Sequence, residues 1–311
     1  MIECQGLTKL YGSLRAVDDL SFKVEPGEVL GFLGPNGAGK STTMRIVAGF
    51  LAPSSGRVSV CGFDVERQPM DAKRRIGYLP EGAPSYPEMT PRSFLYFIAE
   101  ARGIPKAQRA SRLDAAVQQL HLENVLDQTI DTLSKGYRRR VGLAQAILHD
   151  PDVLILDEPT DGLDPNQKHE VRHLISGMAA NKIVVISTHV LEEVDALCNR
   201  AMIIARGRIL ADDTPAGLEA RSRFHNAVSI RFRDGASIDD ARAAINALDE
   251  VASMEADEQT GRLTAFPVEG AMPLAAISKL AEDKSWHLAE LHLESGRLDE
   301  VFRTVTGGAS A

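Results

Sequence analysis

The stretch GPNGAGKST, from Gly34 to Thr42, has residue types and spacing suited to holding phosphate. It matches the pattern G-x-x-x-x-G-K followed by Ser or Thr, and it lies between an apolar run typical of a strand and a run with helical spacing. Backbone N–H groups in this pattern turn inward around phosphate oxygens, at the positive end of the following helix. We therefore expect a nucleotide here, with Lys40 reaching its β- and γ-phosphates and Ser41 ligating Mg²⁺. The residues expected to contact the nucleotide are Gly34, Pro35, Asn36, Gly37, Ala38, Gly39, Lys40, Ser41 and Thr42.

Two adjacent acids, Asp157 and Glu158, end the apolar run VLILDEP. This places them at the carboxyl end of a buried strand, where ligands bind in open α/β sheets. We expect Asp157 to hold hydrated Mg²⁺, and Glu158 to orient or deprotonate a water that attacks the γ-phosphorus. The alternatives are a strand that ends in two solvated carboxylates and, for the loop before it, a glycine-rich turn with an exposed lysine.

Two further residues have the right type but a weaker pattern. His189 follows another apolar run, so its ring is expected at the same edge of the sheet, near a γ-phosphate. A lone histidine at a strand end is more often structural. Tyr11 is either a platform on which a purine stacks or an ordinary strand aromatic.

A second anion site is indicated by LSKGYRRR, from Leu133 to Arg140, hereafter the signature segment. Ser134 is a good N-cap, Gly136 allows close backbone approach, and a helix follows at once. The first loop already holds the phosphates of the one expected nucleotide. One resolution is that Ser134 and Gly136 contact the nucleotide held by a second copy of the chain. The alternative is an ordinary capped helix with a solvated face at Arg138 to Arg140.

The elements around these residues alternate between strands and helices. The runs VLGFLG, DVLILDEP and KIVVIST have strand length and are almost unbroken, which is typical of central parallel strands covered on both faces. From Met89 to His149 the pattern is almost wholly helical and indicates an inserted lobe. We therefore expect an α/β core with a helical lobe.

The flanking segments predict two further β-rich parts. Before the phosphate loop, IECQGLTKLYG and LRAVDDLSFKVE are typical of strands, and RVSVCGFDV after it alternates like one short strand. Past Leu218 no chemistry-bearing motif follows, and a second small domain begins near Phe224. Its order is βαββαβ, which favours a ferredoxin-like unit without assigned chemistry. Its elements are NAVSIRFRD, a helix over 238–248, strands near 251–256 and 262–268, a helix over 274–281 and WHLAELHLE.

Composition limits the possible functions. A chain of 311 residues suggests about two domains. The net charge of -8 and a pI near 5.6 argue against an extended nucleic-acid surface. The 3 cysteines have no metal-binding spacing, and no apolar run approaches the ~18 to 20 residues that span a bilayer. We expect a cytosolic protein whose membrane contact, if any, is made through another chain.

From Ile2 to Leu218 the chain resembles the ATP-binding subunit of an ABC transporter. The resemblance implies a P-loop NTPase of the ABC type: a RecA-like core with an antiparallel β subdomain and a helical lobe. It also implies a head-to-tail dimer that holds two ATP molecules, each between the phosphate loop of one subunit and the signature segment of the other. The matching parts follow the family's order: Tyr11, Gly34 to Thr42, GYLPE at Gly77 to Glu81, LSKGYRRR, LILDEP, DGLD at Asp161 to Asp164, and His189.

Three residues depart from the usual pattern of the family. Glu81 stands where most members have glutamine in the loop that senses Mg²⁺ and touches the membrane subunit. Its extra charge would attract Mg²⁺ but repel the γ-phosphate. Tyr137 replaces the glutamine of the signature, and Asp161 often corresponds to serine. With these departures the chain most resembles class-two exporters and their gliding-motility-associated relatives, which pair this subunit with a separate permease.

The resemblance implies the following organisation and function. Residues 1–220 form the ATPase domain, with the helical lobe at about 86–150, and residues 221–311 form an accessory domain. Ser134, Gly136 and Asp164 contact nucleotide, while Ser41, Glu81 and Asp157 surround the metal. The chain would hydrolyse ATP as a dimer at the inner face of the membrane, coupled to a permease that exports a substrate. Two alternatives are a soluble ABC ATPase acting on DNA or ribosomes, which usually carries a coiled-coil insertion or a second ATPase unit, and a low-turnover nucleotide-dependent regulator.

Overall fold

A computed structural model describes residues 1–179, 182–233, 238–257 and 260–307. The chain divides into two compact units, Met1–Thr214 and Pro215–Ala311. None of the described helices is both long and apolar enough to cross a membrane.

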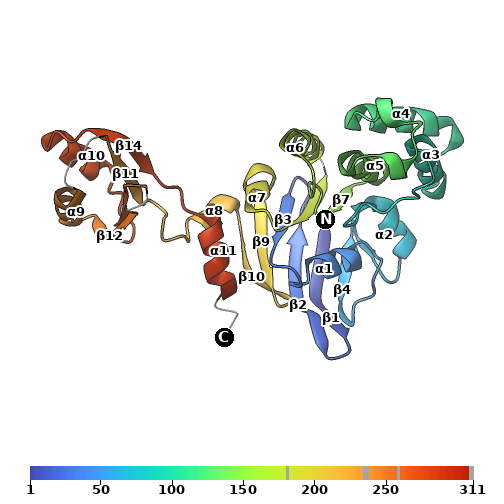
Figure 1. The fold of residues 1–311 in the computed structure, drawn as a ribbon. Coiled ribbons are helices and arrows are strands. Elements are labelled where there is room, and N and C mark those ends of the chain that lie inside the picture. The colour runs from blue at the N-terminus through green and yellow to red at the C-terminus, as the bar shows by residue number, and fades with distance from the viewer. Residues whose placement is uncertain (180–181, 234–237, 258–259, 308–311) are drawn as a thin grey trace. The chain divides into compact units, whose positions relative to one another are not determined.

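The first unit is built around a six-stranded sheet (Figure 1). Its strand order is β10-β9-β3-β8-β7-β6, parallel throughout except for the antiparallel edge strand β10. Every residue of β3, β7 and β8 is buried, as expected for parallel strands covered on both faces. The strands of this sheet are β3 (Val29–Leu33), β6 (Ile76–Leu79), β7 (Val153–Asp157), β8 (Ile183–Thr188), β9 (Arg200–Ala205) and β10 (Arg208–Asp213).

A second, antiparallel sheet has the order β2-β1-β4-β5. The ring of Phe22 on β2 packs edge-on against Phe32 on β3 at 5.2 Å, so the two sheets share one apolar core. The prediction of one strand for RVSVCGFDV is wrong: Cys61 and Gly62 have left-handed φ angles of 51° and 82°, and the resulting turn separates two paired strands. The strands are β1 (Ile2–Tyr11), β2 (Leu14–Val24), β4 (Ser55–Val60) and β5 (Phe63–Asp64).

Helices cover the core and form the lobe seen in green in Figure 1. The lobe contains α3, α4, α5 and two short 3-10 turns, which agrees with the expected helical insertion. The sequence pattern over 69–79 predicts no element, whereas the structure has the 7-residue helix α2 and the 4-residue strand β6 there. The helices are α1 (Lys40–Val47), α2 (Pro69–Arg75), α3 (Pro91–Ala101), α4 (Lys106–Leu120), α5 (Lys135–Ile147), α6 (Pro165–Ala179) and α7 (Leu191–Leu197).

The second unit contains an antiparallel sheet of order β12-β13-β11-β14. With the chain order βαββαβ, this is the ferredoxin-like arrangement. Side chains of α9 and α10 pack on the sheet in a separate apolar core, and α8 packs against α11. The elements are α8 (Pro215–Glu219), β11 (Val228–Phe232), α9 (Ile238–Asn246), β12 (Val251–Asp257), β13 (Arg262–Pro267), α10 (Leu274–Asp283), β14 (Leu288–Leu293) and α11 (Leu298–Gly307).

Candidate functional site

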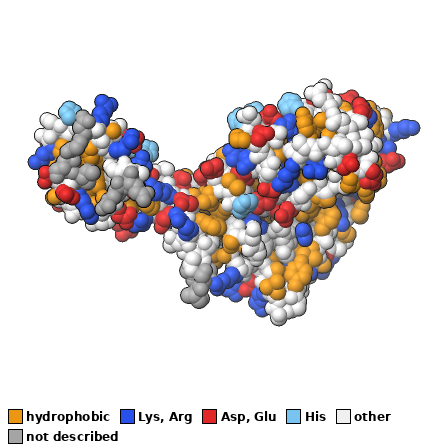
Figure 2. Space-filling view, viewed as in Figure 1, with side chains coloured by type: hydrophobic (Ala, Val, Ile, Leu, Met, Phe, Trp, Pro, Cys, Tyr) orange, Lys and Arg blue, Asp and Glu red, His pale blue; other side chains and the backbone are white. Residues whose placement is uncertain are grey.

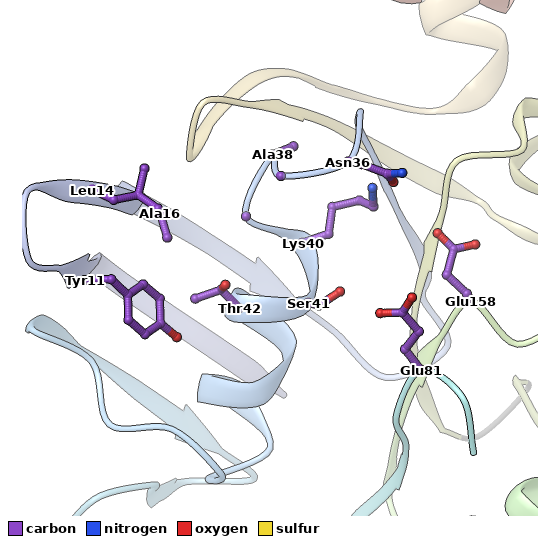
Figure 3. Close-up of a pocket in the computed structure, with 12 residues that line it drawn as sticks. Tyr11, Leu14, Ala16, Asn36, Ala38, Lys40, Ser41, Thr42, Glu81 and Glu158 are labelled. Carbon is purple, nitrogen blue, oxygen red and sulfur yellow. The ribbon is translucent and has the colours of Figure 1, made fainter. Parts of the chain in front are cut away.

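A cavity of about 460 Å³ lies where β3 meets α1. Figure 3 shows Tyr11 on one side of the loop that precedes α1, and the carboxylates of Glu81 and Glu158 on the other. The cavity thus gathers residues that are far apart in the sequence. Its lining consists of Tyr11, Leu14, Ala16, Asn36, Gly37, Ala38, Gly39, Lys40, Ser41, Thr42, Glu81 and Glu158.

The phosphate loop depends on glycine at two tightly enclosed positions. A Cβ atom on Gly34 would lie 2.3 Å from the carbonyl oxygen of Ile204. Gly39 has a φ of 105°, and a Cβ there would lie 2.4 Å from the carbonyl oxygen of Ala16. Other residues would be strained or would clash at these positions, so the glycines fix the path of the loop.

Lys40 is buried and bound to the loop that it follows. Its Nζ donates to the carbonyl oxygens of Gly34 at 2.6 Å and Pro35 at 3.2 Å. Burial lowers the pKa of Lys40, and the charges of Glu158, Asp157 and Glu81 oppose this shift. Gly34 and Pro35 do not line the cavity, but their carbonyl oxygens accept hydrogen bonds from Lys40, which does.

Asp157, the last residue of β7, is fully buried beside Ser41 of α1. Its Oδ1 lies 3.3 Å from the hydroxyl of Ser41 and also accepts a hydrogen bond from the hydroxyl of Ser187. Its Oδ2 is buried and has no hydrogen-bond partner among the described residues. A buried, unpaired carboxylate oxygen beside a hydroxyl is the kind of donor set that a hard divalent cation prefers, so these residues fit Mg²⁺.

Glu158 follows Asp157 in a left-handed conformation, with a φ of 51°. Its N–H donates to the hydroxyl of Ser187 at 3.1 Å, and both of its carboxylate oxygens lie 3.0 Å from Nδ1 of His189. Burial raises the pKa of Glu158, while the hydrogen bond and charge of His189 act in the opposite direction. The pair therefore places a carboxylate with increased proton affinity at the cavity wall.

The signature segment lies outside this cavity. Ser134 caps α5 by accepting a hydrogen bond from the N–H of Tyr137 at 3.3 Å. Gly136 is packed so tightly against Gln167 that a Cβ atom would lie 2.3 Å from its Oε1. Asp164 caps α6 by accepting from the N–H of Gln167 at 2.9 Å. These three predicted nucleotide contacts do not line the cavity of their own chain.

Two residues that support the acids were not predicted from the sequence. Ser187 contacts both Asp157 and Glu158, and its only signal was a hydroxyl at the end of an apolar run. Arg139 donates from Nη2 to the carbonyl oxygen of Asp157 at 2.7 Å. A fully solvated arginine face is wrong for this helix, because Arg139 and Arg140 are both buried.

A parallel sheet whose strands end in a phosphate loop and two acids defines a P-loop nucleotide-binding protein. A family model described as "ABC transporter" matches residues 17–161. The Nod factor export ATP-binding protein I of Paraburkholderia xenovorans is 36% identical over 98% of this chain and 97% of its own length. That of Cupriavidus metallidurans is 37% identical over 69% of this chain and 71% of its own length.

Two solved structures are also similar. One, described as the ATP binding subunit of an ABC transporter, is 30% identical with a TM-score of 0.66, over 71% of this chain and 92% of that one. The other, cbiO1 from Clostridium perfringens, is 28% identical with a TM-score of 0.63, over 71% and 90% of the two chains. The chain belongs to the ATP-binding subunits of ABC transporters. It is an ATP-binding protein and an ATPase of this family.

Proposed function

We propose that the chain hydrolyses ATP as the energy-coupling subunit of an exporter, working as a dimer with a separate permease. The observation that carries this proposal is a cavity lined by the phosphate loop and Glu158. The buried Asp157 contacts Ser41 of its lining, and His189 contacts Glu158. The two relatives named above are called export ATP-binding proteins, which supports the direction of transport.

In the proposed mechanism the phosphate loop holds ATP through its backbone N–H groups, and Lys40 moves from the loop carbonyls to the β- and γ-phosphates. The purine stacks on the ring of Tyr11. Mg²⁺ bound by Ser41 and Asp157, with Glu81 nearby, would neutralise charge on the phosphate oxygens. These assignments match the hydroxyl and the unpaired carboxylate oxygen found beside the cavity.

Glu158 is proposed as the general base. It accepts a proton from a water whose oxygen bonds to the γ-phosphorus, while the bond from that phosphorus to the β-γ bridging oxygen breaks and ADP leaves. A raised pKa strengthens a carboxylate as a proton acceptor at neutral pH. His189 orients this carboxylate through Nδ1.

The signature segment is proposed to complete the site of the partner copy. Ser134 caps α5 and Gly136 lies in its first turn; this helix of 13 residues has an N-terminus that favours an anion. The two residues do not line the cavity of their own chain, so the γ-phosphate of a second protomer is the ligand we assign to them. Asp164 is assigned to the same interface.

An apolar groove in the first unit is the proposed docking site of the permease. It has a volume of about 570 Å³ and lies beside the loop that carries Glu81. In Figure 2 hydrophobic side chains gather on this part of the first unit, whereas acidic and basic side chains are mixed over the rest of the face drawn. We propose that the chain is held in this way at the cytoplasmic face of the membrane. The aromatic lining consists of Phe50, Tyr78, Tyr86, Phe94 and Phe97.

The deciding experiment is the mass in solution of the Glu158→Gln variant, measured by analytical ultracentrifugation with and without ATP and Mg²⁺. We expect ATP to convert monomers to dimers, and we expect the added Ser134→Arg substitution to abolish this change. A mass that ignores both ATP and Ser134, in the presence of the permease as well, would contradict the shared site.

A further inference from the structure

An ion pair joins the signature segment to the turn that follows the proposed base. Nζ of Lys135, the first residue of α5, lies 2.9 Å from Oδ2 of Asp161. The lysine side chain crosses directly over Gly162, where a Cβ atom would lie 2.2 Å from Nζ. Gly162 has a φ of 70°, so the turn is shaped for glycine and leaves a channel for the lysine.

Asp161 is in turn bonded to Glu158. The N–H of Asp161 donates to the carbonyl oxygen of Glu158 at 3.2 Å. Glu158 has a left-handed backbone, and its carboxylate contacts Nδ1 of His189, so a rotation of this turn would change the direction of the proposed base. Lys135 is therefore two contacts away from Glu158 within one chain.

A second tie from the same helix fixes the other side of the turn. One helical turn after Lys135, Arg139 donates to the carbonyl oxygens of Asp157 at 2.7 Å and Pro159 at 3.2 Å. These carbonyls belong to the residues on either side of Glu158. Arg139 is buried, whereas the side chains of the Lys135–Asp161 pair are exposed to solvent.

The exposure of the pair argues against a role in stability. The side chains of Lys135 and Asp161 are 60% and 52% exposed, and exposed ion pairs contribute little to folding. In the proposed dimer this surface would face the ATP of the partner. Covering it would remove water from the pair and strengthen its attraction.

We propose that Lys135 and Asp161 are positioning residues that couple the two ATP sites of the dimer. When the signature segment of one chain binds the phosphate of its partner's ATP, the strengthened pair holds the turn after Glu158 of that same chain in its productive direction. Each chain would then hydrolyse its own ATP best when its signature segment is also occupied. This inference rests on the proposed sandwich dimer.

The proposed coupling and a direct contact of Lys135 with phosphate predict effects on different chains of the dimer. In the proposed dimer, Lys135 of one chain lies near the ATP that its partner binds. The proposed base for that ATP is Glu158 of the partner. If Lys135 only touched that ATP, its loss would harm the partner's Glu158. If it positions Glu158 through Asp161, its loss harms the Glu158 of its own chain.

The test uses mixed dimers purified through two different tags. One protomer carries Glu158→Gln, so the other supplies the one active base. We expect Lys135→Met to lower phosphate release about tenfold when it is in the chain with the intact Glu158, and to have little effect when it is in the Glu158→Gln chain. Asp161→Asn should behave in the same way, and Lys135→Arg should restore turnover.

The controls separate positioning from folding and from assembly. Lys23→Met breaks another exposed ion pair, Lys23–Glu25, whose side chains are 52% and 47% exposed, and should leave turnover unchanged. ATP affinity and thermal midpoint should not change in the Lys135→Met chain. Equal effects in both chains, an effect only in the Glu158→Gln chain, or no effect would overturn the coupling. Failure of the Glu158→Gln protein to dimerise with ATP, in the presence of the permease as well, would instead refute the sandwich on which the coupling rests.

Discussion

Nδ1 of His189 lies 3.0 Å from each carboxylate oxygen of Glu158. The two residues come from the ends of neighbouring parallel strands, β8 and β7, which explains how side chains 31 positions apart meet. The contact orients the carboxylate of Glu158 and leaves the other ring nitrogen of His189 available to a ligand. In the proposed mechanism Glu158 is therefore the base, and His189 is the residue that orients it.

Replacement of the base should separate binding from turnover. We expect Glu158→Gln to retain ATP binding and to lower kcat by about 10²- to 10⁴-fold, because glutamine cannot accept the proton of the attacking water. Phosphate release and nucleotide titration would measure the two effects. Wild-type protein with its permease that binds ATP but releases no more phosphate than this variant would favour a regulator instead.

Loss of Lys40 should act mainly on binding. Lys40→Ala removes the ammonium group that we assign to the β- and γ-phosphates, so ATP affinity should fall at least about tenfold. Isothermal titration calorimetry measures this directly. An equal loss of affinity in Glu158→Gln would contradict the separate roles of the two residues.

The charge of Glu81 should be visible in the metal dependence. Glu81 shares the cavity with Ser41 and Glu158, so Glu81→Gln removes one negative charge from the proposed Mg²⁺ site. We expect the Mg²⁺ concentration for half-maximal turnover to rise several-fold, because carboxylates attract Mg²⁺ more strongly than amides. A metal titration of ATPase activity in which the two proteins coincide would remove Glu81 from the metal site.

Protein stability without nucleotide should report the burial of Glu158. Because burial raises its pKa above the ordinary 4.5, the folded protein keeps a proton that the unfolded chain has lost as the pH rises past this value. The free energy of unfolding therefore decreases as the pH rises above about 4.5, and Glu158→Gln abolishes this decrease because glutamine does not titrate. The melting temperature of the variant minus that of the wild type should increase from about pH 4 to about pH 7. The exposed Glu66→Gln change is the control, and a constant difference for Glu158→Gln would refute the shift.

The accessory unit is expected to support regulation or dimer stability, by virtue of its position after the ATPase. A chain that ends at Thr214 removes the second compact unit as a whole. We expect it to bind ATP like the full chain but to dimerise or turn over differently, as measured by sedimentation and phosphate release. Unchanged dimerisation, ATPase rate and transport would exclude both roles.

The sequence could predict elements whose signal is local. VLGFLG and VLILDEP indicate buried strands by their apolar length, and GPNGAGKST specifies the loop between β3 and α1 by its glycines. Strand β6 was missed because four residues are too short to show a period. The same limit hid the turn at Cys61, where a residue other than glycine adopts a left-handed backbone.

The missed parts of the site depend on contacts between distant segments. Nothing near Ser187 in the sequence indicates that its hydroxyl serves both acids of another strand. Arg139 looked like part of a solvated cluster, and only tertiary packing buries it against the carbonyls beside Glu158. Residue types and their spacing could predict the nucleotide-binding and catalytic residues. The hydrogen bonds that support these residues join distant segments and could be seen only in the folded structure.

The packing of α8 against α11 has a consequence for the history of the chain. These helices are the first and last elements of the second unit, so that unit closes on itself. Its covalent connection to the first unit is the single peptide bond between Thr214 and Pro215. A unit whose first and last helices pack together can be gained, exchanged or lost by recombination as one block, without a change in the path of the ATPase chain that precedes it.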